Sequence, residues 1–226
     1  MEEAENDPLR TWAGEFGQAY TERNRDETVT DVDEEHEERF GVTMSALFER
    51  FLADLDRDAR ILEVGCNVGV QLDLLSELGF ENLTGVDVQR GALEIARTRR
   101  SAPEVVRADA RALPFADGAF DLVCTVDVLI HVPPTMIDAV MDELVRCSRG
   151  AIYGCEFYAP EYTEVVFRGE TGVLWKTDFA ARYEDGREVM LVEEERLAYA
   201  GEEPTTVGDQ FVSAFLLEKF GDRAGR

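Results

Sequence analysis

The sequence has 226 residues, of which 45% are hydrophobic, and it carries 48 acidic against 23 basic side chains, a formal net charge of −25. The chain is long enough to fill the core of one large domain, and its charge argues against nucleic acid or an anionic membrane as a partner. Only Lys176 and Lys219 are lysines. So acidic a chain, with so little lysine, indicates a salt-rich cytoplasm, where a Debye length of about 3 Å at 1 M screens self-repulsion. An acidic protein of ordinary salinity is the alternative.

The cysteines and the lengths of the apolar runs indicate the cellular compartment of the protein. No two cysteines have CxxC spacing, and only His36 and His131 could assist them, so we expect no metal site. No apolar run approaches the roughly 18 residues of a membrane span, and the acidic start does not resemble a signal peptide. These features predict a reduced, cytoplasmic protein with four free thiols, on Cys66, Cys124, Cys147 and Cys155.

The N-terminal part has helical spacing. Trp12, Phe16 and Tyr20 recur every four residues, although Gly14 and Gly17 interrupt the run. Each glycine costs a helix interior about 1 kcal/mol relative to alanine. The stripe therefore belongs either to ordinary core or to a lid over a ligand.

An acidic stretch, residues 26–39, follows and is expected to be a solvated connection and a helix start. The next apolar residues have the spacing of an amphipathic helix: Met44, Leu47, Phe48, Phe51, Leu52 and Leu55. We expect residues 1–58 to form a helical cap packed on the same domain.

From residue 59 to residue 226, short apolar runs alternate at first with helical segments. This pattern predicts an α/β, Rossmann-like fold: a mostly parallel seven-stranded sheet with helices on both faces and two final antiparallel strands. The expected strands are residues 60–64, 83–87, 104–109, 120–126, 151–157, 187–195 and 211–219. The expected helices are residues 70–78, 90–100 and 137–145.

The first expected strand runs into the glycine turn "ILEVGCNVGVQL". A dinucleotide fingerprint needs G-x-G-x-x-G, but Asn67 and Val70 stand where two of its glycines belong, and only Gly65 and Gly69 remain. Glu63 just before the turn would repel a pyrophosphate, whereas it suits a cationic ligand.

Two more carboxylates end the next strands. Asp87 is placed to accept both ribose hydroxyls, and Asp109 can accept an adenine amino proton. Three carboxylates at neighbouring strand ends favour an adenosine that carries positive charge. S-adenosylmethionine, a sulfonium with an ammonium group, fits this description.

These motifs resemble those of class I S-adenosylmethionine-dependent methyltransferases, whose glycine motif is similar to "LEVGCNVG". The resemblance implies that Gly65 and Gly69 cradle the methionine part while Glu63 holds its amino end. It also implies that Asp87 binds the ribose, and that Asp109 with Ala110 binds the adenine. The turn and strand-end neighbours Cys66, Asn67 and Val88 complete this expected cofactor site. Asn67 departs from the commoner glycine at its position.

The likeness extends over nearly the whole chain. The segments "WAGEFGQAYTERN", "ILEVGCNVG", "VLIHVPP" and "FRGETGVLWKTDFA" resemble the pseudaminic acid biosynthesis-associated methylase family, which implies a sugar acceptor. In class I methyltransferases a segment before the first strand commonly folds over the cofactor. We therefore expect Tyr20, Arg23 and Asn24 to belong to a lid and Phe16 to the core.

The acceptor side is expected beyond strands four and five. His131 in "VLIHVPP" and Glu156 in "CEFYAP" are the candidate catalytic bases, since a hydroxyl acceptor benefits from a base near neutral pKa. Tyr158, two residues after Glu156, is a candidate substrate-binding residue. An excursion at about residues 158–182 is long enough to wall a substrate pocket. Its candidate anion-binding and stacking residues are Arg168, Trp175 and Lys176.

The sequence thus predicts an S-adenosylmethionine-dependent methyltransferase acting on a sugar, nucleotide-sugar or glycan precursor, most simply an anionic one. A methyltransferase of another small metabolite, or of a sugar-acid carboxylate, is one alternative. A non-catalytic binder of the cofactor is the other.

Overall fold

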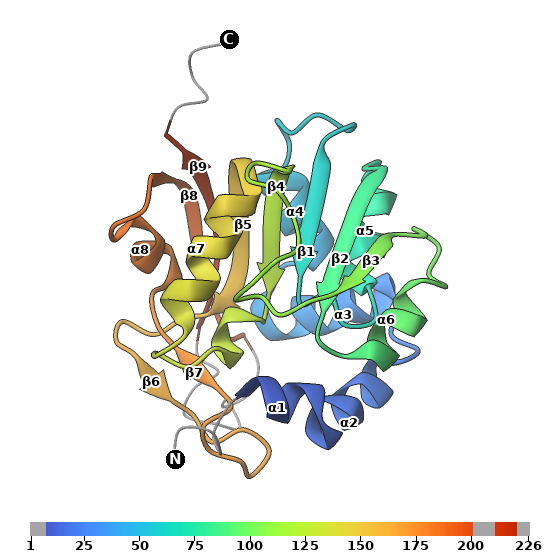
Figure 1. The fold of residues 1–226 in the computed structure, drawn as a ribbon, viewed down its shortest axis with the longest axis vertical. Helices are drawn as coiled ribbons and strands as arrows, with labels where there is room; N and C mark the ends of the chain where they lie inside the picture. The colour runs from blue at the N-terminus through green and yellow to red at the C-terminus, as the bar shows by residue number, and fades with distance from the viewer. Residues whose placement is uncertain (1–7, 201–210, 221–226) are drawn as a thin grey trace.

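The computed structural model describes residues 8–200 and 211–220. Four helices precede the sheet: α1 (Pro8–Ala13), α2 (Glu15–Asn24), α3 (Val29–Phe40) and α4 (Met44–Phe51). Gly14 ends the expected aromatic helix and is the N-cap of a second one. Helices α1 and α2 lie together across the lower end of the sheet in Figure 1. The placement of a domain boundary near residue 58 stays a prediction.

Helix α3 corrects the expectation for residues 26–39, most of which are helical rather than a connection. Thr28 and Asp31 form a reciprocal capping box that satisfies backbone donors at the helix start, and Gly41 ends the helix in the left-handed region. Val32, His36 and Phe40 are buried from this otherwise acidic helix. The run is therefore amphipathic, with an acidic outer face.

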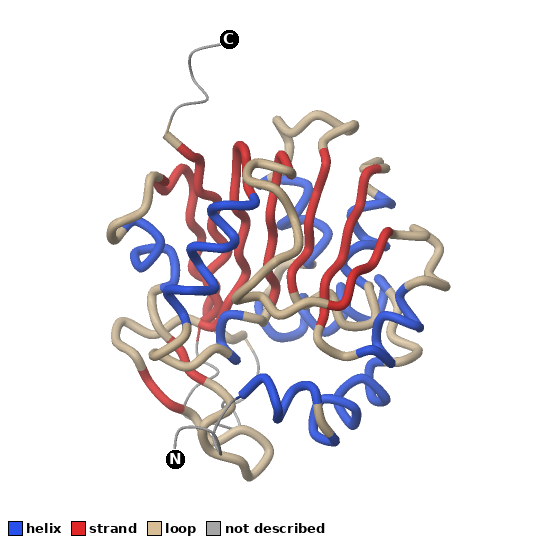
Figure 2. The backbone as a smooth tube through the Cα atoms, viewed as in Figure 1, coloured by secondary structure: helices blue, strands red, loops and turns tan. Residues whose placement is uncertain are grey.

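Seven strands form one sheet, as the sequence predicts, and their order is β3-β2-β1-β4-β5-β9-β8. Strands β1 to β5 are parallel, and β9 pairs antiparallel with both β5 and β8. Figure 2 shows the sheet in red between helices. The strands are β1 (Arg60–Val64), β2 (Asn82–Asp87), β3 (Glu104–Arg107), β4 (Phe120–Val126), β5 (Ser148–Phe157), β8 (Val189–Ala198) and β9 (Phe211–Lys219).

The remaining elements connect or cover these strands, and α5 and α7 match the helices expected there. In Figure 1, α7 and α8 cover one face of the sheet and α4 and α5 the other. The sixth helix ends at Ala96, short of the expected residue 100. These elements are α5 (Val70–Glu77), α6 (Arg90–Ala96), the 3₁₀ turn η1 (Leu129–His131), α7 (Ile137–Cys147), the hairpin strands β6 (Thr163–Glu164) and β7 (Trp175–Lys176), and α8 (Phe179–Glu184).

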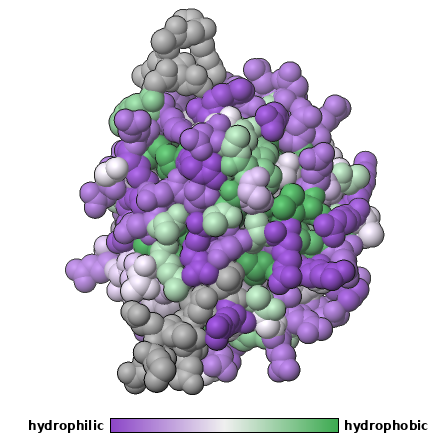
Figure 3. Space-filling view, viewed as in Figure 1, coloured by the Kyte–Doolittle hydropathy of each residue, from purple (hydrophilic) through white to green (hydrophobic). Residues whose placement is uncertain are grey.

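The core is continuous across both faces of the sheet, and its strands are buried. Ile61, Leu62 and Leu122 have 0% exposure, as expected for parallel strands covered on both sides. The visible face in Figure 3 is mostly hydrophilic, with apolar side chains in patches between the charged ones. Within the described residues, no helix combines the length and apolarity needed to cross a bilayer.

Candidate active site

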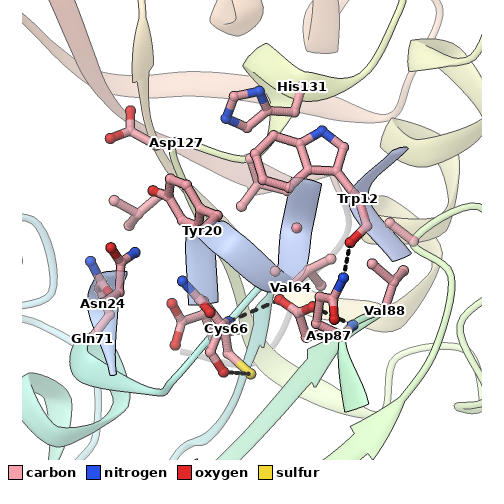
Figure 4. A pocket seen from close by; sticks show the side chains of 18 of the residues that line it. Trp12, Tyr20, Asn24, Val64, Cys66, Gln71, Asp87, Val88, Asp127 and His131 are labelled. Atoms are coloured by element: carbon pink, nitrogen blue, oxygen red, sulfur yellow. Dashed lines mark hydrogen bonds between the residues drawn. The ribbon is translucent and has the colours of Figure 1, made fainter. Parts of the chain in front are cut away.

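A cavity of about 410 Å³ lies where the parallel strands end, and α1 and α2 border it (Figure 4). Its size is in the range of about 300–1,000 Å³ that is usual for small-molecule sites. The carboxyl edge of an open parallel sheet is where α/β proteins bind ligands. Of the residues expected at the cofactor, all but Arg23 and Gly69 line this cavity.

The glycine turn brings backbone to the cavity wall. Gly65 has a φ of +78°, and a Cβ added there would lie 2.5 Å from Cγ2 of Val128. No other residue fits this position without displacing Val128. Asn67 adopts a φ of +44°, so the turn is left-handed although a glycine is missing. Gly69 acts at the N-cap of α5 and packs on Ala96.

Glu63 is the penultimate residue of strand β1. Its carboxyl side chain is buried, with 2% exposure, and it lines the cavity. Its Oε2 atom has no hydrogen-bond partner among the described residues. Burial and the nearby charge of Asp87 raise the pKa of Glu63 to about 8. A nearby cation would stabilise the ionised form of this buried carboxyl, and the ammonium group of S-adenosylmethionine would supply one. The cofactor's charge therefore fits the residues present.

Asp87 ends β2 beside it. Its Oδ2 accepts a hydrogen bond from the backbone N–H of Asn67 at 2.9 Å, and its Oδ1 accepts one from Gln89 at 2.7 Å. Burial raises the pKa of Asp87, while these backbone hydrogen bonds act in the opposite direction. The carboxylate is thus fixed in orientation, and each oxygen retains acceptor capacity for a ribose hydroxyl.

Asp109 is held by Arg111 at the far end of the cavity. The guanidinium donates Nη2–H to Oδ2 of Asp109 at 2.7 Å and Nε–H to the same oxygen at 2.9 Å. Burial raises the pKa of Asp109, but the hydrogen bonds from Arg111 outweigh it and the pKa falls. Asp109 is therefore an ionised acceptor at the place expected for adenine.

The N-terminal helices close over this edge. Trp12 and Tyr20 pack edge-to-face at 5.5 Å, and both line the cavity. Asn24 lines it too, while Arg23 is exposed and lies over the ring of Tyr20 at 5.3 Å. The expectation that Arg23 faces the cofactor therefore fails, because its charge remains in water. Phe16 packs on Trp12 and Phe167 outside the cavity.

His131 is the last residue of η1 and lines the cavity beside Trp12, with ring centroids 4.3 Å apart. Its Nδ1 lies 2.7 Å from the carbonyl oxygen of Val173. A carbonyl only accepts, so Nδ1 carries the hydrogen and Nε2 is left as an acceptor. Burial lowers the pKa of His131 to about 4, against the opposing effect of this hydrogen bond. The ring is therefore neutral at physiological pH.

Known proteins are similar to this chain in sequence and in fold. A methyltransferase domain family matches residues 62–151, the segment from β1 to the start of β5. Residues 62–151 are thus similar to a methyltransferase domain. The structure of magnesium protoporphyrin IX methyltransferase from Synechocystis, with bound S-adenosylhomocysteine, superposes with a TM-score of 0.67 and 13% identity over 93% of this chain and 98% of that one. This similarity shows a Rossmann-like fold of the kind found in that methyltransferase.

Curated relatives match over a shorter span. Methyltransferase GfsG of Streptomyces halstedii is 37% identical over 109 residues, which are 46% of this chain and 38% of that protein. A phthiotriol/phenolphthiotriol dimycocerosates methyltransferase of Mycobacterium ulcerans is 34% identical over 97 residues, 42% of this chain and 35% of that protein. The matched part is thus well under half of each relative. By their names, the Mycobacterium and Synechocystis methyltransferases act on different molecules, so similarity to such a domain does not select an acceptor.

The structure of the excursion at about residues 158–182 corrects three expectations. Arg168 lines the cavity, but Trp175 and Lys176 do not. Trp175 is 8% exposed, and Lys176 is 2% exposed with Nζ 4.5 Å from the ring centroid of Phe157. Lys176 is thus a buried cation that lies over the ring of Phe157 and outside the cavity. It is not placed to contact an acceptor bound in the cavity. Tyr158 lies under the guanidinium of Arg196, also outside it.

Glu156 is likewise not at the cavity wall. It has 0% exposure and accepts hydrogen bonds from the backbone N–H groups of Val128 at 3.0 Å and Ile130 at 3.4 Å. Burial and Asp127 raise its pKa to about 8. Its position under the β4–η1 turn is that of a residue that fixes this turn, so the expected role as base does not agree with the geometry.

Sequence reasoning missed Asp127 and His36, which both line the cavity. Asp127 directly follows β4 and has a φ of +52°, a strained conformation for a residue with a side chain. A carboxylate at the end of a fourth neighbouring strand was a signal, since Glu63, Asp87 and Asp109 were found in that way. His36 lay in the stretch expected to be solvated.

Proposed function

We propose that the protein transfers a methyl group from S-adenosylmethionine to a hydroxyl of a small, polyhydroxylated acceptor: a sugar, nucleotide-sugar or glycan precursor. The unpartnered, buried Oε2 of Glu63 carries the first half of this proposal. A pyrophosphate beside this carboxyl would be repelled, whereas an ammonium group would be held. Asp87 and Asp109 complete a row of acceptors across β1, β2 and β3 for one charged adenosine.

The residues of the cavity have separate tasks in this proposal. Bound S-adenosylmethionine supplies a methyl group on a positively charged sulfur, a good leaving group. The chain therefore mainly has to position the acceptor and exclude water, which can supply much of the acceleration. Trp12 and Tyr20 cover the cavity edge, and Gln89 holds this cover in place by donating a hydrogen bond to the carbonyl of Gly14 at 3.1 Å.

His131 is the proposed base. A hydroxyl must lose a proton as it attacks, and a positioned base assists typically by about 10²–10⁴-fold. The hydrogen bond from Nδ1 to Val173 fixes the tautomer that leaves Nε2 able to accept this proton. Burial lowers the pKa of this ring to about 4, so the ring is unprotonated at neutral pH, but it is a weaker base than one with a pKa near neutrality. A carboxylate acceptor would need no such base.

The sugar acceptor is supported by the resemblance to the pseudaminic acid biosynthesis-associated methylases and by Arg168. This residue lines the cavity, and no carboxylate forms a salt bridge with it within the described residues. A guanidinium at that place suits a carboxylate or phosphate of the acceptor. With Lys176 buried elsewhere, the proposal of an anionic acceptor depends on Arg168 alone.

The test is transfer of label. The protein is incubated with methyl-labelled S-adenosylmethionine and a panel of sugar acids, nucleotide-sugars and glycan lipids, and the products are identified by mass. A labelled methyl ether supports the proposal, whereas a labelled amine would identify a nitrogen acceptor and contradict it. A methyl ester would identify a carboxylate acceptor instead. Tight cofactor binding without transfer to any candidate would support a non-catalytic binder.

A further inference from the structure

The cavity has a second wall that the proposed cofactor site does not use. Besides the strand ends, it is lined from helix α3 and its surroundings by Glu27, Val32, Glu35, His36, Arg39 and Gln71. Three of these are carboxylate or amide side chains that can accept hydrogen bonds from hydroxyls.

His36 is the most informative residue of this wall. It is 8% exposed, and its Nδ1 lies 2.6 Å from the carbonyl oxygen of Val42. Because that oxygen can only accept, the hydrogen is on Nδ1 and a lone pair is on Nε2. Nε2 is buried and has no partner among the described residues. A buried acceptor without a donor is costly, so such a group in a cavity wall indicates a ligand that donates to it.

Helix α3 extends this second wall away from the strand ends that are expected to bind the cofactor. Glu63, Asp87 and Asp109 lie at or near the ends of β1, β2 and β3, which occupy one side of the sheet order. Helix α3 reaches the other side, since the guanidinium of Arg39 lies 5.4 Å from the ring of Phe157, the last residue of β5. A ligand held by α3 would therefore lie on the side of the cavity away from Asp109, where adenine is expected.

The chemistry of the wall selects the ligand. Glu27 and Glu35 repel anions, and Arg39 is already paired with Glu35 at 3.2 Å. A neutral imidazole acceptor, two carboxylates and an amide instead match several hydroxyl donors. We propose that this second wall of the cavity is the acceptor-binding subsite. In it, Nε2 of His36 accepts a hydrogen bond from a ring or side-chain hydroxyl of a sugar. This proposal rests on the proposed function and specifies its acceptor site.

Two substitutions separate the two ring nitrogens. In His36→Asn the amide N–H can replace Nδ1–H toward Val42, but nothing replaces Nε2. In His36→Gln the amide reaches the place of Nε2 while the link to Val42 is lost. Glu38→Gln, on the exposed face of the same helix, is the control. Melting temperatures measured for each variant show whether it is folded.

The experiment uses the full chain saturated with S-adenosylhomocysteine. N-acetylneuraminic acid, CMP-N-acetylneuraminic acid and UDP-N-acetylglucosamine are titrated by calorimetry, while long-range ¹H–¹⁵N spectra follow Nε2 of His36. We expect one of these sugars to bind and to shift the Nε2 signal. We expect His36→Asn to weaken that binding about 10-fold or more. His36→Gln should retain more of the affinity, and Glu38→Gln all of it.

Three results would overturn the subsite. One is a shift of Nε2 on adding S-adenosylhomocysteine alone, which would assign His36 to the cofactor. The second is a sugar that binds equally well to His36→Asn. The third is the absence of binding by all three sugars, which would remove the commitment to a polyhydroxylated ligand. A sugar that binds through His36 but receives no label would leave the subsite standing and overturn the proposed function.

Discussion

Gln89 ties the N-terminal helices to the sheet: its side-chain amide donates hydrogen bonds to the carbonyl oxygens of Trp12 and Gly14. Gly17 makes this approach possible. A Cβ on Gly17 would lie 1.8 Å from the Trp12 oxygen and 2.6 Å from Nε2 of Gln89. The glycine that seems to weaken a helix thus allows α2 to pack on α1 and on the end of β2.

We therefore expect Gly17→Ala to displace the cover of the cavity. Cofactor affinity should fall about 10-fold or more, while the melting temperature changes little, because the sheet core is not touched. The measurement is calorimetry with S-adenosylhomocysteine. Gly91→Ala is the matched control, since a Cβ there meets nothing within 4 Å. Equal affinity of both variants would mean that the N-terminal helices are not a lid.

Glu63 makes cofactor binding depend on pH. With a pKa of about 8 in the free protein, Glu63 is mostly protonated at pH 6, and its ionised form increases as pH rises. A cationic ligand favours the ionised form, so binding should release a proton and affinity should rise between pH 6 and 7.5. Titrations in two buffers of different ionisation enthalpy measure this release. Glu63→Gln should lose both affinity and the pH dependence; a variant that kept the dependence would refute the assignment.

The same buried carboxyls affect folding. The pKa values of Glu63 and Glu156 are raised to about 8 in the folded protein, from the ordinary value of 4.5 for a solvent-exposed carboxyl. The folded state thus holds more protons than the unfolded state between these values. The free energy of unfolding should therefore fall as pH rises from 5 to 8 without ligand. Glu156→Gln should flatten this fall in urea titrations at fixed high salt, and an unchanged slope would count against the burial of Glu156.

The strand pattern and three strand-end carboxylates could be predicted, because they depend on local apolar runs and on one sheet edge. The burial of Trp175 and Lys176 outside the cavity could not be predicted. Scarcity of lysine suggested a binding role, but packing decides where a side chain goes, and Lys176 is buried over Phe157. Glu156 failed for a related reason: its position at a strand end is visible in the sequence, whereas its burial under Val128 is not. For α3, Thr28 and Asp31 in "TVTD" form a capping box in the structure, whereas the acidic composition favoured a solvated connection.

His131→Asn tests the proposed base. The amide can still donate to Val173, while Nε2 is lost, so the turn should keep its shape. Turnover should fall by about 10²–10⁴-fold for a hydroxyl acceptor, with cofactor affinity nearly unchanged. Steady-state kinetics with labelled cofactor provide the measurement. Unchanged turnover would indicate an acceptor that loses no proton, such as a carboxylate.

Arg168 and Lys176 should now behave differently. Arg168→Ala is expected to raise the Michaelis constant of an anionic acceptor, because a cavity-lining guanidinium is lost. Lys176→Met should leave that constant unchanged and alter the melting temperature instead, since Lys176 is buried outside the cavity. A raised Michaelis constant in Lys176→Met alone would contradict this placement.

The net charge of −25 predicts a protein that folds best in salt. Lowering ionic strength from 1 M to 0.1 M extends the reach of charge repulsion from about 3 Å to about 10 Å. The melting temperature should fall by many degrees over this range. A flat melting temperature from 0.1 to 3 M potassium chloride would mean that the acidity serves another purpose.

The most direct test of a charged-adenosine site is a calorimetric comparison of S-adenosylmethionine with NAD on the wild type and on Asp87→Ala. We predict that the wild type binds S-adenosylmethionine and not NAD. Asp87→Ala should lose charged hydrogen bonds worth roughly 1.5–3 kcal/mol, which weakens binding about 10- to 150-fold. Tighter binding of NAD than of S-adenosylmethionine, or unchanged affinity in Asp87→Ala, would contradict the account.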